Sequence, residues 1–373
     1  MTWTAGRLPA TPDLQSVTRD DNRSTSFGGP ILVVGPSRSG TSMVRESLNR
    51  HRLVWVVRET HYFDDLRPKL AHRGAAPLED GEREKVERYF LALGHRAYGA
   101  EADASQSSVS EIELRERAQA LGDGGDAYFE AFCRIRGEQN GKVVWGEKTP
   151  RHAFRIAEML DAYPEARIVC LIRDPRAVVA SYRDWTRRPA LDPSQGGPWA
   201  ADRTRARRSY NIVVASLLAK AALRAAMRAR SRFGADRVRL LVYEDLVREP
   251  EPSYAELMEW LGLPYDPAML DVPLVQSSYA QAGEAGISTE PLERWRKKLS
   301  PAEVRVIESC CGDVMQELGY ALERPSCSPL AVPLAWLSTI PAGLRVAAVN
   351  RRRLGRAGRY VGARLRLGLS RAG

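Results

Sequence analysis

Metal-binding and disulfide patterns are missing from this chain of 373 residues. Its five cysteines show no C-x-x-C spacing, and an odd number with two adjacent members makes a poor disulfide framework. We therefore expect no bound metal and a reducing compartment. A secretory signal is not expected either, because the first 25 residues are polar and are interrupted by Pro9 and Pro12. Together these absences predict a cytoplasmic protein.

Acidic residues are missing from the C-terminal segment Arg324–Gly373, which contains ten arginines. Because the net charge of the whole chain is +10, the rest of the chain is near neutral, and nucleic-acid binding is not indicated. The mixture of leucine, valine, alanine and arginine from Leu344 to Leu369 is typical of a helix that lies on an anionic membrane surface. Peripheral contact with the inner membrane surface is one interpretation of this tail, and a solvated basic tail is the other.

A long uninterrupted apolar run is missing as well. Residues 330–349 are fairly apolar, but Pro333, Pro341 and Arg345 interrupt them. The uninterrupted stretches fall well short of the roughly 20 residues that cross a bilayer as a helix. No transmembrane helix is therefore predicted.

Apolar segments of strand length alternate with helical patterns along the chain. This alternation predicts an α/β fold, in which helices flank a parallel sheet. Ligands of such sheets bind beyond the carboxyl ends of the strands. The predicted strands are Ile31–Gly35, Leu53–Val57, Arg167–Ile172 and Val238–Tyr243.

One large domain with two tails is the organisation that the sequence favours. Residues 1–28 are expected to form a flexible N-terminus, residues 29–325 the folded domain and residues 326–373 a basic amphipathic tail. Within the domain, the charged residues 66–141 predict a mostly helical insertion that covers the acceptor site as a lid. Proline and glycine within residues 186–202 predict a mobile loop.

The most informative segment is Pro30–Ser42, where a buried strand leads into a turn of small and hydroxyl-bearing residues. Gly35 and Gly40 have the spacing of the phosphate loop Gly-x-x-x-x-Gly-Lys-(Ser/Thr), but Thr41 occupies the lysine position and the cation is Arg38. Backbone N–H groups at the start of the next helix still point at a bound oxyanion, and the helix dipole adds to the attraction. The pattern predicts an anion-binding loop with altered chemistry.

Four further segments place reactive or anion-binding groups just after a predicted strand or near the end of the domain. They supply carboxylates, an imidazole, one of the seven lysines of the chain, and arginines beside an aromatic ring. Asp174 and Pro175 are the residue types of a helix N-cap and first turn. The segments are Val57–Asp64, Trp145–Pro150, Arg173–Ser181 and Arg294–Lys298.

At these residues the chain resembles the sulfotransferases that use 3'-phosphoadenosine 5'-phosphosulfate, particularly their bacterial and glycan-modifying branch. The likeness extends over roughly Pro30–Tyr320 and implies the sulfotransferase fold, whose anion loop is related to the phosphate loop of nucleoside triphosphatases. Glu59–Asp64 resembles the Glu-x-His-(Phe/Tyr)-Phe-Asp run of glycan sulfotransferases, and Glu147–Pro150 resembles their Glu-Lys-(Ser/Thr)-Pro. Tyr243–Leu246 is also similar to the family.

The resemblance implies a set of donor-binding residues. The loop residues would hold the 5'-phosphosulfate, and an arginine at a later strand end, with a serine eight residues further on, would hold the 3'-phosphate. The basic aromatic segment near the end of the domain would make further donor contacts. The residues implied are Arg38, Ser39, Gly40, Thr41, Ser42, Arg173, Ser181, Trp295, Arg296 and Lys297.

Sulfuryl transfer proceeds in line from a phosphate oxygen to an acceptor oxygen or nitrogen, so positioning and charge stabilisation are the main catalytic requirements. Arg38 and Lys148 would neutralise the leaving oxygen, and no metal is required. Many family members carry lysine in place of Arg38, so Lys148 is expected to take more of the proton-donor role. Glu59 is the first choice for the base that deprotonates the acceptor, and His61 is the second.

Other interpretations stay open from the sequence. A phosphate-loop kinase is the main one, although the missing lysine before Ser42 and the lack of a clear magnesium-binding aspartate after a strand count against it. A noncatalytic membrane adaptor is another. Structural roles are the alternative for single residues: Lys148 pairing with Glu147, and His61 orienting Glu59. The residues do not specify the acceptor, which we expect to be a glycan, a lipid or another small molecule.

Overall fold

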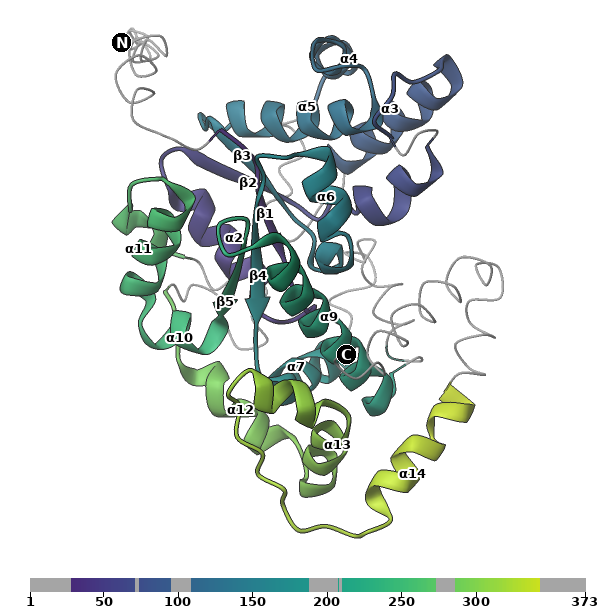
Figure 1. Ribbon diagram of the computed structural model, residues 1–373, viewed down its shortest axis with the longest axis vertical. Coiled ribbons are helices and arrows are strands. Elements are labelled where there is room, and N and C mark those ends of the chain that lie inside the picture. Colours follow the sequence, from purple (N-terminus) through teal and green to yellow (C-terminus); the bar gives the residue numbers. More distant parts are fainter. Residues whose placement is uncertain are drawn as a thin grey trace, which may run out of the picture.

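A five-stranded parallel sheet forms the centre of the protein (Figure 1). The computed structural model describes residues 28–70, 74–94, 109–187, 207, 210–272 and 286–342. The strand order is β2-β3-β1-β4-β5, and every neighbouring pair is parallel. The predicted parallel α/β fold is therefore confirmed. The strands are β1 (Ile31–Val34), β2 (Val54–Arg58), β3 (Val144–Lys148), β4 (Arg167–Ile172) and β5 (Val238–Val242).

Strand β3 is the one that the sequence did not predict. We expected the segment Trp145–Pro150 to follow a strand, and this was wrong, because most of it is the strand. Its apolar part is short, and Gly146, Glu147 and Lys148 complete it. All five residues of β3 are nevertheless buried, since the strand lies between β1 and β2. A strand covered on both faces and both edges shows no apolar–polar alternation that would reveal it.

Helices cover both faces of the sheet. Short π and 3-10 segments, written η, lie mainly in the connections at its carboxyl edge. The elements are α2 (Thr41–Arg50), η2 (Tyr62–Leu66), η3 (Arg67–Lys69), α3 (Asp80–Gly94), α4 (Glu111–Ala120), α5 (Gly125–Glu138), η6 (Pro150–Phe154), α6 (Ile156–Ala162), α7 (Pro175–Arg187), α9 (Ile212–Phe233), α10 (Tyr243–Arg248), α11 (Pro250–Leu261), η8 (Pro267–Leu270), α12 (Glu290–Lys298), α13 (Pro301–Glu317) and α14 (Ala331–Leu337).

Alternate residues of the strands feed two hydrophobic cores. Ile31 and Val33 of β1 pack in a core with side chains of α2, α10 and α11. Leu32 and Val34 point the other way, into a core that includes α5, α6, α9 and α13. The period of two along each strand thus divides the molecule into helix, sheet and helix layers (Figure 1). Both cores hold the carboxyl edge of the sheet rigidly between them.

The expected insertion at residues 66–141 is helical where it is described. Helix α5 packs on β2 and β3, so this helix is the crossover between the two strands, and α3 and α4 cover it (Figure 1). Its role as a lid stays a prediction. Most of the expected loop at 186–202 and the tail beyond residue 342 lie outside the described residues.

Gly146 in the middle of the sheet offers a test of this packing. A Cβ atom there would overlap the carbonyl oxygen of Ile31 and come within 3.1 Å of Val56 Cγ2. We expect Gly146→Ala to lower the free energy of unfolding by about 1–3 kcal/mol, because overpacking displaces the backbone. Urea unfolding followed by circular dichroism measures this change. The matched control is Gly81→Ala in α3, where an added Cβ atom would meet no neighbouring side chain or strand within 4 Å. Equal losses of stability for both variants would contradict the packing described.

Candidate functional site at the carboxyl edge of the sheet

The turn between β1 and α2 is held in a shape that few side chains permit. Gly40, with φ 103°, lies so close to Tyr243 that a Cβ atom would overlap the aromatic ring. Arg38 also has a positive φ, of 73°. The Ser39 side chain is fully buried, and its Oγ makes no hydrogen bond within the described residues. A buried hydroxyl without a partner beside the uncapped first turn of α2 is suited to an oxyanion.

Arg173, just after β4, fixes this turn from the other side. Its guanidinium lies over the Tyr243 ring, with its central carbon 3.9 Å from the centroid. Its Nη1 donates to the carbonyl oxygen of Arg38 at 3.1 Å, and its Nη2 to that of Pro291 at 3.4 Å. Arg38 Nε in turn donates to Ser181 Oγ at 3.3 Å. The two predicted halves of the donor site therefore meet, although residues 38 and 173 are 135 positions apart.

The predicted catalytic residues also lie together. Lys148 Nζ, at the end of β3, donates to Glu59 Oε1 at 2.8 Å and to Ser42 Oγ at 3.4 Å. His61 Nε2 lies 3.4 Å from Glu59 Oε2. The alternative pairing of Lys148 with Glu147 is not the one observed. Lys148 thus connects the anion loop to the carboxylate that is the candidate base.

The environment of Glu59 strongly favours its ionised form. Burial by itself raises the pKa of the Glu59 carboxyl, but the Lys148 ammonium, together with a hydrogen bond from His61, outweighs this effect and holds the pKa well below its ordinary value. A carboxylate with so low a pKa is a weak base. The arrangement described therefore keeps Glu59 ionised and paired with Lys148.

Glu147 is a fully buried carboxylate that ties the ends of β2 and β3 together. Its Oε1 accepts hydrogen bonds from the backbone N–H of Thr60 at 2.9 Å, from the Thr60 hydroxyl at 3.0 Å and from the Thr149 hydroxyl. Its Oε2 lies 3.3 Å from His152 Nδ1. Since Thr60 separates Glu59 from His61, these bonds position both candidate bases. The sequence placed Glu147 in a family-like motif without giving it this role.

Glu244 is a half-buried carboxylate whose role the sequence did not reveal. Its Oε1 accepts from the backbone N–H of Asp174 at 3.0 Å, and its Oε2 accepts from the Tyr320 hydroxyl at 2.7 Å. Burial raises the pKa of Glu244 above its ordinary value. Tyr243 and Glu244 directly follow β5. The Tyr243 ring lies under Arg173, and the Glu244 carboxylate fixes the residue that precedes α7.

The basic aromatic segment Arg294–Lys298 belongs to α12. This helix lies beside Arg173, whose Nη2 donates to the carbonyl oxygen of Pro291 in its first turn. Trp295 itself is 4% exposed and packs between the guanidinium groups of Arg176, at 4.2 Å, and Arg296, at 4.5 Å. Arg296 pairs with Glu293 and Glu323, and Lys297 is exposed. The indole of Trp295 therefore belongs to the core, and donor contact by these three residues stays a prediction.

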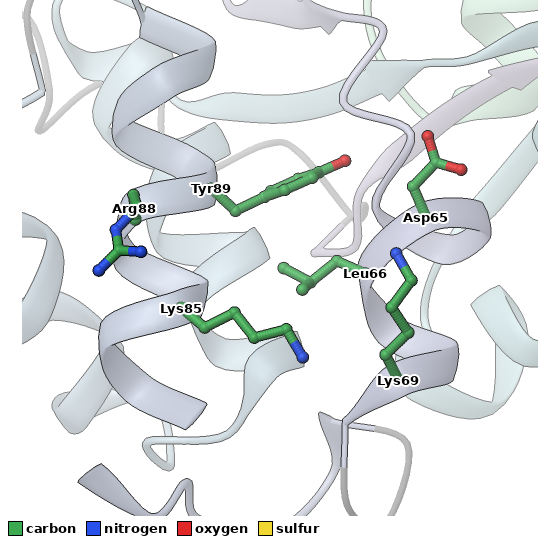
Figure 2. Close-up of a pocket in the computed structure, with 6 residues that line it drawn as sticks. All are labelled: Asp65, Leu66, Lys69, Lys85, Arg88 and Tyr89. Atoms are coloured by element: carbon green, nitrogen blue, oxygen red, sulfur yellow. The ribbon is translucent and has the colours of Figure 1, made fainter. Parts of the chain in front are cut away.

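A pocket of about 320 Å³ opens next to the candidate bases, between α3 and the η2–η3 segment. Figure 2 shows the side chains of Lys69 and Lys85 extending into this gap from opposite sides, with Tyr89 above them, while Arg88 lies at the rim. The Tyr89 hydroxyl donates to the carbonyl oxygen of Thr60, which joins the pocket to the site. The lining residues are Asp65, Leu66, Lys69, Lys85, Arg88 and Tyr89.

The part of the chain that the structure describes contains neither a candidate metal site nor a membrane-spanning helix. No group of three or more histidine, cysteine, aspartate or glutamate residues there has a geometry that could hold a metal ion. No helix among the described residues has the length and apolar character needed to cross a membrane.

Fold and site together define an α/β protein whose sheet carries, at its carboxyl edge, a loop suited to an anion. The sulfotransferase family model matches residues 30–267, which is more than half of the chain. The chain therefore belongs to the sulfotransferase family.

Individual relatives agree with this assignment. The chain is 28% identical to human carbohydrate sulfotransferase 3 over 177 residues, which are 44% of this chain and 35% of that protein. It is 27% identical to the nodulation protein NoeE of Sinorhizobium fredii, over 48% of this chain and 45% of that protein. The chain thus spans less than half the length of these two relatives. Identity to human carbohydrate sulfotransferase 6 is 25%, over 78% of this chain and 80% of that protein.

Among solved structures, the sulfotransferase domain from the curacin biosynthetic pathway is similar to the chain. The two share a TM-score of 0.48 and 15% sequence identity, and the match covers 79% of this chain and 99% of that domain.

Replacing the buried carboxylate of Glu147 tests its structural role. Burial raises the pKa of Glu147. The charge of His152 and the hydrogen bonds from His152, Thr149 and Thr60 outweigh this effect, so the pKa lies below the ordinary value of 4.5. The carboxylate therefore stabilises the fold at pH values above 4.5, and this contribution is lost as the pH falls through the lowered pKa. We expect Glu147→Gln to cost about 1–3 kcal/mol at pH 7 and to weaken the loss of stability in acid.

Denaturant unfolding at pH 7 and at several acidic pH values measures both effects. Glu138→Gln is the matched control, because Glu138 lies on the surface and pairs with exposed Arg117. A change within about 1 kcal/mol is expected for this control. If Glu147→Gln behaved like the control at pH 7, the carboxylate would not anchor the two strand ends.

Proposed function

We propose that the protein transfers a sulfuryl group from 3'-phosphoadenosine 5'-phosphosulfate to a hydroxyl or amine of a carbohydrate or similar acceptor. The observation that supports this proposal most is the junction of the anion loop with Arg173 and Ser181, next to the Glu59–Lys148 pair. A donor with two separate anionic groups matches two adjoining cationic sites. The carbohydrate sulfotransferases among the relatives favour a sugar acceptor.

The residues present suit such a donor. The buried Ser39 hydroxyl and the N–H groups at the start of α2 would donate hydrogen bonds to one anionic end of the donor molecule. Arg173 and Ser181 would bind its other anionic end. The donor supplies the activated sulfuryl group. Arg38 and Lys148 stabilise negative charge on the leaving oxygen, an effect that is worth about 3–4 kcal/mol per donor in comparable sites.

Lys148 has two partners, and this gives the site an order of events. While its ammonium is paired with Glu59, the carboxylate is a weak base. An anion next to Ser42 attracts the ammonium, because Ser42 Oγ already lies 3.4 Å from Lys148 Nζ. As Lys148 turns towards the anion, the pKa of Glu59 rises, and the carboxylate becomes able to take the proton of the acceptor.

Turnover of purified variants tests these roles. With labelled donor and an acceptor panel, Glu59→Gln is expected to lower kcat by about 10²–10⁴-fold, as removal of a general base does. Its affinity for 3',5'-adenosine bisphosphate is expected to stay close to that of the wild type, whereas Arg173→Ala is expected to weaken that affinity. Calorimetry measures the binding. Full turnover by Glu59→Gln would remove Glu59 from the base role, and a larger loss in His61→Gln would transfer that role to His61.

The same calorimetry separates sulfuryl from phosphoryl transfer. Binding of 3',5'-adenosine bisphosphate without metal is the expected result. Tight, magnesium-dependent binding of ATP in its place would instead identify a phosphate-loop kinase.

For the acceptor, the pocket beside Tyr89 favours an anionic molecule. Lys69, Lys85 and Arg88 line it together with a single carboxylate, Asp65. Glu84 pairs with Arg88, and Arg151 pairs with both Asp64 and Asp65. A ring such as that of Tyr89 offers a sugar an apolar face. We therefore favour an acceptor that carries a carboxylate, sulfate or phosphate close to the reacting hydroxyl.

Charge reversal at Lys85 tests this preference. We expect Lys85→Glu to raise KM for an acidic glycan several-fold or more, with a smaller effect on a neutral glycan of the same length, because the loss is electrostatic. Arg232→Glu, on the exposed end of α9, makes the same change in net charge away from the pocket and is the control. Initial rates at low and high salt provide the measurement. Equal effects on the acidic and the neutral glycan would contradict an anionic acceptor.

A further inference from the structure

Large apolar side chains are exposed together in and directly beside one short helix, α14 (Ala331–Leu337). The described residues contain eight exposed large hydrophobic side chains, and five of them lie between positions 330 and 340. Single exposed leucines are common on protein surfaces, but a contiguous cluster marks an interaction surface. The five are Leu330 (61% exposed), Leu334 (58%), Trp336 (37%), Leu337 (59%) and Ile340 (64%).

The inner side of α14 is attached to the folded domain. Val332 and Ala335 pack against the main core, and Ala342 is 2% exposed. Asn211 Nδ2 donates to Ser338 Oγ at 2.8 Å. The helix lies against α13 and α9 at the periphery of the molecule (Figure 1).

The exposed residues follow helical spacing. Positions 330, 334 and 337 differ by four and three, which places them on one face, opposite Val332 and Ala335. We call Leu330, Leu334, Leu337 and Ile340 the outer face of α14. An amphipathic helix normally turns its apolar side to the core and its polar side to water. Here the inner side is already packed, so the outer face is left for a partner.

Charge identifies the partner that suits this face. From Arg324 to Gly373 the chain has ten arginines and no acidic residue. An apolar helix face within a sequence segment so rich in arginine is the combination that binds membranes rich in anionic lipid, since apolar side chains enter the headgroup region and positive charge attracts the lipid. A second copy of the chain is a poorer fit, because a symmetric dimer would bring two arginine-rich segments together.

We propose that the outer face of α14 inserts into the surface of a membrane that contains anionic lipids. The proposal does not depend on sulfuryl transfer. It describes attachment at the interface, in agreement with the finding that no described helix can span a bilayer. Attachment of this kind would hold the domain close to acceptors in or on the membrane.

Vesicle flotation of the full chain tests the proposal. The vesicles are phosphatidylcholine alone, or phosphatidylcholine with about one third phosphatidylglycerol, an anionic lipid. We expect the wild type to float with the anionic vesicles and to bind neutral vesicles far more weakly. The double variant Leu334→Gln and Leu337→Gln should bind the anionic vesicles at least about tenfold more weakly, because two apolar side chains no longer enter the lipid.

Ile112→Gln is the matched control, since Ile112 in α4 is 66% exposed and lies far from α14 in the sequence. It should float like the wild type, and all variants should keep the same melting temperature. The proposal is overturned if the wild type does not float, if the double variant floats as well as the wild type, or if neutral vesicles bind equally well. Light scattering adds one more contradictory outcome: a wild-type dimer that the double variant converts to a monomer would assign the outer face to self-association.

Discussion

Positive charge at the carboxyl edge of the sheet is the constraint on which the site depends. Arg38, Lys148 and Arg173 come from three different strand ends, and the last two are almost fully buried. A buried cation costs several kcal/mol unless it is paired or solvated. Lys148 uses Glu59 for this purpose, while the hydrogen bonds of Arg173 go to carbonyl oxygens. Carbonyl dipoles stabilise a guanidinium without neutralising it, so this edge attracts an anion.

Two carboxylates, Glu147 and the half-buried Glu244, fix the backbone around this concentration of charge. Glu147 holds the ends of β2 and β3, and Glu244 holds the start of α7 after β4. Neither needs to meet a ligand for this function. They fix the backbone on both sides of the anion loop, so that Glu59, Lys148 and Arg173 are in place before any ligand arrives. Such preorganisation is the largest contribution that a protein makes to charge stabilisation.

Local pattern was sufficient to predict the parallel sheet and the turn between its first strand and the next helix, and the family resemblance placed Arg173 and Ser181 at the same site as Arg38, where the structure has them. Local pattern failed at β3, because this strand is half polar and is buried by its neighbours, a tertiary effect that no local period records. It also missed the roles of Glu147 and Glu244, since a buried carboxylate looks like a surface carboxylate until its donors are known. The packing of the Trp295 indole in the core was not predicted either, and its contact with the donor stays a prediction.

Two prolines in the C-terminal region concealed a short helix from sequence patterns. Pro333 and Pro341 interrupt an apolar run, and the sequence predicts the amphipathic helix further on, at residues 344–369, which lie outside the described residues. The structure places a helix at Ala331–Leu337, before that segment. Proline is tolerated there because Pro333 lies in the first turn, where the backbone N–H has no partner within the helix. A proline that argues against a transmembrane span is therefore compatible with a short helix at a membrane surface, because the helix needs only one intact apolar face and tolerates proline in its first turn.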